Sequence, residues 1–216
     1  MLAFRLRVQW LGAAALIAVT PRANAQVAGS LGAFIGYYRP FGSFDPASVY
    51  STDLPNQPSD LQGLAAGVSA AISLTARFGS AATLAMIRSE VPQITTPGGP
   101  RGPTGVQILV GTVEGRINVL PRSYASRLWL GLGPAFVRHG GTAYSRYGSP
   151  TSLGAAASLE AVVALRTHLE WATGATGMAY TIDIPMPPEL RLNPGQLEHG
   201  NQRDVVFRTG LAWRYR

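Results

Sequence analysis

The residues best suited to chemistry are three histidines, His139, His168 and His199. Nucleophilic catalysis needs a nucleophile, a base and an orienting group within hydrogen-bond reach of one another. His168 is followed two residues later by Glu170, and His139 stands three residues before Thr142. Neither spacing places a hydroxyl nucleophile beside its base. We therefore interpret the histidines as polar loop and turn residues and expect no catalysis.

The sequence gives no pattern for a metal, a cofactor or a nucleic acid. It contains no cysteine and its three histidines are widely separated, whereas structural zinc sites use closely spaced ligands. All 18 basic residues are arginine and the formal net charge is +7, but the arginines are scattered singly. Nucleic-acid sites instead gather basic residues into runs or patches. We expect no metal, no cofactor and no nucleic-acid partner.

The N-terminus has the three parts of a secretory signal peptide. Arg5 and Arg7 form a basic region, residues 11–19 form a short apolar run, and Ala23 and Ala25 form an A-x-A site. The apolar run is too short for a membrane-spanning helix, which needs about 20 apolar residues. We predict a signal peptide over residues 1–25, cleavage between Ala25 and Gln26, and one domain over residues 26–216.

The exported part is predicted to be all-β. Eight candidate strands alternate with turns, at Leu31–Tyr38, Leu64–Thr75, Ala81–Ser89, Val106–Leu120, Ser126–Val137, Leu153–Leu165, His168–Ile182 and Val205–Tyr215. The connections between them alternate long and short along the chain. The long ones are rich in Pro, Gly, Ser and Asn and cover residues 39–63, 90–105, 138–152 and 183–204. Outer-membrane barrels show this asymmetry, with short periplasmic turns and longer extracellular loops.

The strands have one apolar face and one small, polar or charged face. In the fourth strand the apolar set is Leu109, Val113, Ile117 and Val119, and it alternates with Thr112, Glu114, Arg116 and Asn118. Only 13% of all residues are charged, about half the usual share for a globular chain. A lipid-facing wall explains both observations. We predict an eight-stranded, antiparallel, up-and-down transmembrane β-barrel.

Aromatic residues gather near the ends of the predicted strands. In transmembrane barrels such residues form girdles at the two membrane–water interfaces. We predict that the interfacial aromatics include Tyr37, Trp129, Trp171, Trp213 and Tyr215.

The first and last strands resemble those of a known family. Leu31–Pro40 (LGAFIGYYRP) and Val205–Tyr215 (VVFRTGLAWRY) are similar to the opening and closing strands of the small OmpA/OmpX-type outer-membrane barrels. The resemblance implies a location in the cell outer membrane, with outer-membrane lipid and lipopolysaccharide as surroundings. It also implies that the last strand is read by the barrel-assembly machinery. We expect a monomer.

The charged residues on the polar faces are predicted to fill the lumen. An eight-stranded barrel is about wide enough for side chains alone, and buried charges must be paired. We predict a Glu–Arg network that plugs the barrel, made of Glu114, Arg116, Arg127, Glu160, Glu170, Arg208 and Arg214. An ion pathway along the same residues is the alternative.

Three functions are open at this stage. The favoured one is a structural or surface-interacting barrel with an extracellular ligand at its long loops, whose arginines Arg101, Arg138 and Arg146 are candidates to pair with lipid phosphates. The second is a lipid-modifying hydrolase, since lipid A deacylase barrels resemble this chain in size. Those enzymes carry a His-x-Ser pair where this chain has His168-Leu-Glu170. The third is a soluble lipocalin-like barrel, which requires the apolar faces to point inward.

Overall fold

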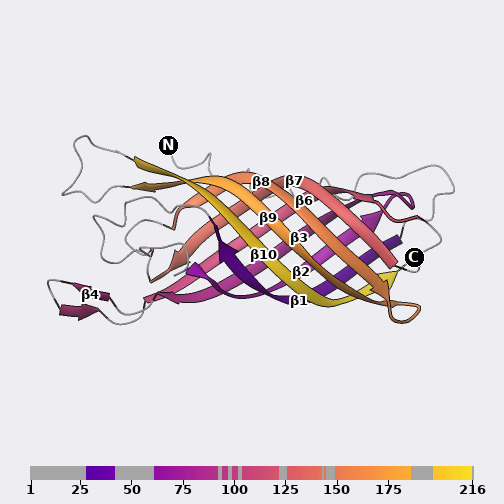
Figure 1. Cartoon of the computed structure of the whole chain (residues 1–216), viewed down its shortest axis with the longest axis horizontal. Coiled ribbons are helices and arrows are strands. Elements are labelled where there is room, and N and C mark those ends of the chain that lie inside the picture. The colour runs from indigo at the N-terminus through magenta and orange to yellow at the C-terminus, as the bar shows by residue number, and fades with distance from the viewer. Residues whose placement is uncertain are drawn as a thin grey trace, which may run out of the picture.

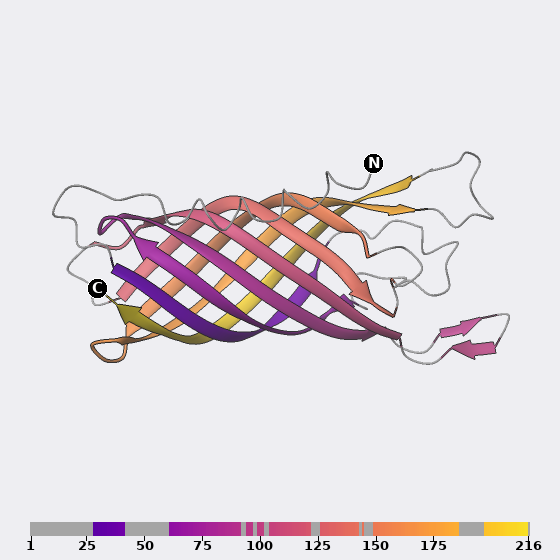
Figure 2. The ribbon, with the colours of Figure 1, turned by 180° about the vertical axis from the view of Figure 1, so that it is seen from behind.

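The computed structural model describes residues 28–41, 61–91, 94–96, 99–101, 104–121, 126–142, 144, 149–185 and 197–215. Eight strands close into a barrel in which every hydrogen-bonded neighbour is antiparallel, in the order β1-β10-β9-β8-β7-β6-β3-β2 (Figures 1 and 2). Their bounds are β1 Ala28–Pro40, β2 Gly63–Ser73, β3 Phe78–Val91, β6 Thr104–Asn118, β7 Ser126–Gly141, β8 Thr151–Ala164, β9 Leu169–Pro185 and β10 Leu197–Tyr215. The predicted fold class is confirmed.

Alternation along each strand sorts the side chains between lumen and outer wall. In β1, Leu31, Ala33 and Ile35 are exposed on the outer wall, while Phe34 and Tyr38 are buried inside. The eight predicted strands are all present. The structure extends most of them at the end opposite the C-terminus, and β10 begins eight residues before the predicted start. Around Asn201 and Arg203 both faces carry polar groups, so no period-2 hydrophobic signal marks that part of the strand.

Side-chain oxygens accept hydrogen bonds that fix two of the short connections. The backbone N–H groups of Arg77 and Phe78 donate to Thr75 Oγ1, at 3.1 and 2.9 Å, and close the turn between β2 and β3. Asn118 Oδ1 accepts from the N–H groups of Leu120 and Leu128, at 3.2 and 3.1 Å, and holds the start of β7 against the end of β6. These turns lie at the same end of the barrel as the C-terminus (Figure 1).

The connection between β3 and β6 differs from the prediction. It contains a two-stranded hairpin, β4 Ile94–Thr96 and β5 Gly99–Arg101, where the sequence analysis expected a loop without strands. The hairpin stands off the barrel at the end opposite the C-terminus (Figures 1 and 2). No helix among the described residues has the length and hydropathy to cross a membrane.

Candidate functional site

The outer wall of the barrel is apolar. Val113 and Ile117 on β6, and Val119 directly after it, point outward with exposed fractions of 47, 41 and 47%. Leu109, the fourth member of the predicted apolar set, is half-buried. The same wall exposes large apolar side chains from every barrel strand, among them Leu31, Ile35, Leu64, Val68, Leu84, Leu132, Leu153, Leu159, Trp171 and Leu211. A lipocalin-like barrel would bury this face, so that alternative is wrong.

Two threonine hydroxyl groups on the wall have hydrogen-bond partners. Thr209 Oγ1 accepts from Trp171 Nε1 at 2.9 Å, and Thr173 Oγ1 donates to the carbonyl of Arg208 at 3.2 Å. An unpaired polar group costs several kcal/mol in hydrocarbon. The wall therefore satisfies the main requirement of a lipid-facing surface.

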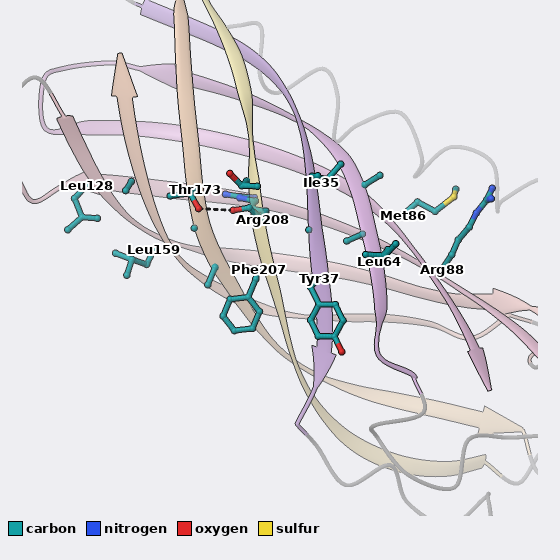
Figure 3. A pocket seen from close by; sticks show the side chains of 17 residues that line it. Ile35, Tyr37, Leu64, Met86, Arg88, Leu128, Leu159, Thr173, Phe207 and Arg208 are labelled. Carbon is teal, nitrogen blue, oxygen red and sulfur yellow. Dashed lines mark hydrogen bonds between the residues drawn. The ribbon is translucent and has the colours of Figure 1, made fainter. Parts of the chain in front are cut away.

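A large hollow among the described residues lies on this wall and not in the lumen. It has a volume of about 1140 Å³ and is lined by outward-facing side chains that include Ile35, Tyr37, Leu64, Leu159 and Phe207. Figure 3 shows Tyr37 and Phe207 side by side, on β1 and β10, which agrees with their pairing in the strand register. The hollow is a surface feature of the apolar wall, so it does not mark an interior binding site.

Four of the five predicted interfacial aromatics lie on the outer wall. Tyr37 is exposed toward one end of the barrel, and Trp171, Trp213 and Tyr215 are exposed toward the end with the short turns. The prediction for Trp129 is wrong, because its side chain is only 5% exposed. Its neighbours Leu128 and Leu130 face outward, so alternation directs Trp129 into the lumen, beside the charged groups there.

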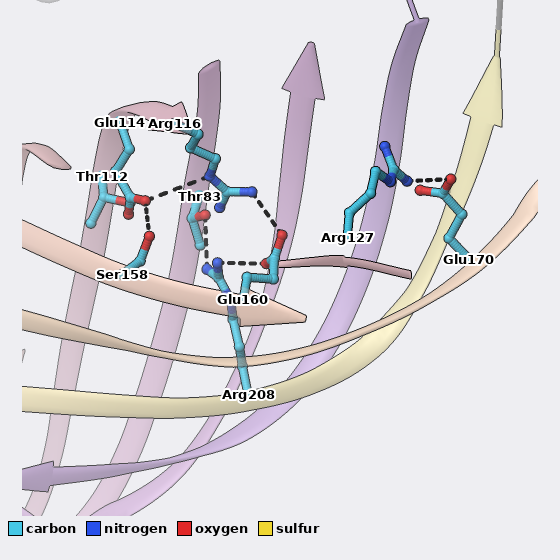
Figure 4. A network of polar contacts seen from close by, with 9 residues as sticks. All are labelled: Thr83, Thr112, Glu114, Arg116, Arg127, Ser158, Glu160, Glu170 and Arg208. Carbon is cyan, nitrogen blue, oxygen red and sulfur yellow. Dashed lines mark hydrogen bonds and ion pairs between the residues drawn. The ribbon is translucent and has the colours of Figure 1, made fainter. Parts of the chain in front are cut away.

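Glu160 is the centre of an ion-pair network in the lumen (Figure 4). Its two carboxylate oxygens accept from Arg116 Nη1 and Arg208 Nη2, each at 2.7 Å. Arg116 Nε also lies 3.6 Å from Glu114, whose carboxylate accepts from Thr112 and Ser158. Arg208 Nη1 donates to Thr83 at 3.0 Å. The network joins β3, β6, β8 and β10 across the barrel.

A second ion-pair cluster lies closer to the end with the short turns. Arg127 Nη2 is 2.5 Å from Glu170 Oε1, and Arg214 Nη1 is 3.6 Å from the same oxygen. All seven charged residues predicted for the lumen therefore lie inside it and take part in ion pairs with one another. The hollow beside them, lined by Arg116, Arg127, Glu160 and Glu170 among others, measures only about 30 Å³.

The opposite half of the lumen is an apolar core that the sequence analysis did not predict. It contains Ile87, Ile108, Val110, Val137, Met178, Ile182 and Val206. Within it Asp204 accepts hydrogen bonds from Tyr38 at 2.6 Å, Tyr180 at 2.5 Å and Gln202 at 2.8 Å. We name Tyr38, His139, Tyr144, Tyr180, Gln202 and Asp204 the mouth cluster. The alternation Gln202-x-Asp204-x-Val206-x-Arg208 could have revealed it, but the predicted strand began at Val205.

His139 links the mouth cluster to the end of β7. Its Nε2 lies 3.3 Å from the Tyr180 hydroxyl, and its ring centroid lies 5.3 Å from that of Tyr144. The preceding residue, Arg138, is exposed at the polar edge of the wall, so His139 lies beyond the apolar band. Burial lowers the pKa of His139 to about 4. Burial, reinforced by the negative charge of Asp204, raises the pKa of Tyr144.

This burial predicts a pH-dependent stability. Because the folded state holds His139 neutral, the unfolded chain takes up the proton first as the pH falls below 6.5. The free energy of unfolding should therefore fall between pH 6.5 and 4 by on the order of 3 kcal/mol from this group. Thermal unfolding in detergent at pH 7 and pH 4.5 measures the change. His139→Gln should flatten the dependence, whereas His168→Gln, at an exposed turn, should keep it.

The residues considered as candidates for catalysis lie in different surroundings. His168 is exposed, stacks on Trp213 and contacts the carbonyl of Arg214 at 3.1 Å, whereas Glu170 is buried in the lumen. His139 contacts rings and the Tyr180 hydroxyl inside the barrel mouth. The side chain of His199 lies outside the described part of the structure, as does Arg146. Neither His168 nor His139 is brought against a serine or threonine hydroxyl by any of these contacts.

The comparisons with known proteins agree with this architecture. No protein-family model matches the sequence, and no curated protein matches it. The structure is similar to that of the outer membrane protein OprG from Pseudomonas aeruginosa, with 14% identity, 87% of this chain and 95% of OprG covered, and a TM-score of 0.58. The fold is that of a small outer-membrane barrel. The predicted resemblance to OmpA/OmpX-type barrels is thus confirmed at the level of fold.

Two further solved structures extend the likeness. Neisserial surface protein A is 12% identical, with 87% of this chain and 99% of that protein covered and a TM-score of 0.56. Outer Membrane Protein W of E. coli is 14% identical, with 89% and 100% covered and a TM-score of 0.51. All three comparisons span nearly the whole of the other chain, so the likeness concerns the complete barrel.

Proposed function

We propose that this protein is an integral barrel of the bacterial outer membrane with a closed lumen and a structural or surface-interacting role. The observation that carries the proposal is the distribution of charged side chains between the lumen, the edges and the outer wall of the barrel. Along the described strands, charged side chains lie in the lumen or at the edges of the barrel, and the wall between the edges is uncharged. A water-soluble barrel has no physical reason to expose that wall.

The ion pairs support a plug and not a pathway. Glu160 bridges two arginines that come from different strands, and the hollow beside them is about 30 Å³. Between these ion pairs and the end of the barrel opposite the C-terminus, the apolar core and the mouth cluster fill the lumen. A hydrated ion would have to break several buried ion pairs to pass, so the role of the network is to fill and brace the lumen.

The remaining parts of the proposal rest on the sequence. Residues 1–25 would direct export and be removed after Ala25, and they lie outside the described residues together with Gln26. The barrel-assembly machinery would read β10. Most of the long connections, which would carry any contact with an extracellular ligand, also lie outside the described residues. We propose no enzymatic activity and a monomeric state.

Two measurements on the full chain test this function. The protein should be recovered in the outer-membrane fraction and should migrate faster on a gel before heating than after, as compact barrels do. Reconstituted in a planar lipid bilayer, it should give no steady conductance. Recovery in the soluble periplasmic fraction would contradict the membrane barrel, and regular single-channel steps would contradict the plug.

A further inference from the structure

Four arginines point outward at one edge of the apolar wall. Arg39 on β1, Arg88 on β3, Arg138 on β7 and Arg203 on β10 are all exposed. The sequence analysis placed Arg138 in a loop, but it belongs to a strand. We name these four residues the arginine ring. They come from both sides of the barrel, so the feature encircles the molecule and is not a local patch.

The strand register places the four arginines at one level. Arg88 pairs with Leu64, and Leu64 pairs with Tyr37, which lies two residues before Arg39. On its other side Arg88 pairs with Gln107, and Gln107 pairs with Gly140, which lies two residues after Arg138. Arg39 pairs with Val205, two residues after Arg203. Tilted strands shift the level of a hydrogen-bonded neighbour by about one residue per strand, so these offsets bring the arginines to one height, to within about one residue.

The surroundings of the ring fix its depth in a membrane. On one side lie the apolar wall residues Leu64, Met86 and Phe207, which are exposed. On the other side lie polar outward positions such as Gln107 and Asn201. The Arg39 guanidinium sits 5.1 Å from the ring centroid of Phe41, a cation–π contact of the kind found at interfaces. The ring is therefore at the boundary between acyl chains and head groups, at the end of the barrel opposite the short turns.

We propose that the arginine ring binds the phosphate groups of phosphorylated lipid in the outer leaflet, a lipid of the lipid A type. A guanidinium forms paired, charge-assisted hydrogen bonds with phosphate oxygens, and these are strong where water is sparse. The apolar wall next to the ring, on the side of the short turns, would contact the acyl chains of the same lipid. This inference rests on the proposed membrane location and adds a ligand to it.

The test uses the protein purified in non-ionic detergent and titrated with bisphosphorylated lipid A or with dephosphorylated lipid A of the same acyl chains. Bound lipid is counted by native mass spectrometry. We expect the phosphorylated form to bind at least tenfold more tightly. Replacing all four arginines (Arg39→Gln, Arg88→Gln, Arg138→Gln and Arg203→Gln) should abolish that preference, and each single replacement should weaken binding by up to about tenfold.

A matched control separates the ring from general charge. Arg77→Gln with Arg166→Gln removes two exposed arginines at the short turns and should leave the preference intact. Equal loss in this control, equal binding of the two lipids by the unchanged protein, or displacement of the lipid by millimolar inorganic phosphate would each overturn the inference. Heat-modifiable migration of every variant is measured in parallel. A folded, membrane-recovered barrel without lipid preference would contradict the ring while leaving the proposed function in place.

Discussion

Replacing Glu160 with alanine is expected to lower the free energy of unfolding by about 3–5 kcal/mol. The change leaves the guanidinium groups of Arg116 and Arg208 buried without the carboxylate that both now contact at 2.7 Å. Attraction between charges is strong in the lumen because little water screens it. The midpoint of urea unfolding in lipid vesicles, followed by tryptophan fluorescence, measures the effect.

Two companion variants show whether the loss comes from unpaired charge. Glu90→Ala removes an exposed carboxylate at the edge of the same barrel and should change stability by less than about 0.5 kcal/mol. Arg116 also faces the buried Glu114, so the apolar replacement of the triad includes that residue. The combination Glu114→Gln, Arg116→Met, Glu160→Leu and Arg208→Met should recover most of the loss, because uncharged side chains of similar size replace buried ion pairs at little cost. If this variant were as unstable as Glu160→Ala, unpaired charge would not be the explanation.

The second large effect is expected on the outer wall. Leu132 is 69% exposed and lies on β7 about midway between the arginine ring and the short turns. Leu132→Arg places a charge at the middle of the proposed hydrocarbon layer, which costs about 2–4 kcal/mol in transmembrane barrels. The free energy of unfolding in lipid vesicles should fall by that amount, and the yield in the outer-membrane fraction should fall with it.

A second substitution, closer to the surface of the proposed membrane, is the control for Leu132→Arg. Leu153 is 78% exposed and is the third residue of β8, near the level of Arg138, so Leu153→Arg should cost no more than about 1 kcal/mol. A soluble barrel would tolerate both arginines equally, since both positions would face water. Equal effects at Leu132 and Leu153 would therefore contradict the membrane proposal itself.

The wall and the ion pairs could be predicted because each depends on local alternation. Val113 and Glu114 are neighbours in the sequence and point to opposite sides of a strand, so their types alone indicate which side is lipid and which is lumen. Closing eight strands then leaves a space that side chains fill, and this brings Glu160 between Arg116 and Arg208.

The orientation of Trp129, the mouth cluster and the strand extensions were not predicted correctly from the sequence, for a different reason. Trp129 was assigned by its position near a strand end, whereas its orientation follows from parity with Leu128 and Leu130. The mouth cluster joins Tyr38, His139 and Asp204 from three strands far apart in the sequence. Local alternation could place Asp204 in the lumen, but it does not indicate which side chains of other strands meet it there. The strand extensions at the end opposite the C-terminus carry polar residues on their outer side and enclose apolar groups, so their outer residues resemble loop sequence.

The pairing of β1 with β10 has a consequence for how the barrel is made. The register runs from Gly29 opposite Tyr215 to Pro40 opposite Asp204, so the seam joins the two ends of the barrel domain. A chain arrested before β10 would present two long unpaired edges, which invite aggregation. Because closure needs contacts between residues so distant in sequence, it is intrinsically slow. The barrel can thus close only once β10 is available to pair with β1 and β9, and until then the unfinished sheet keeps two unpaired edges.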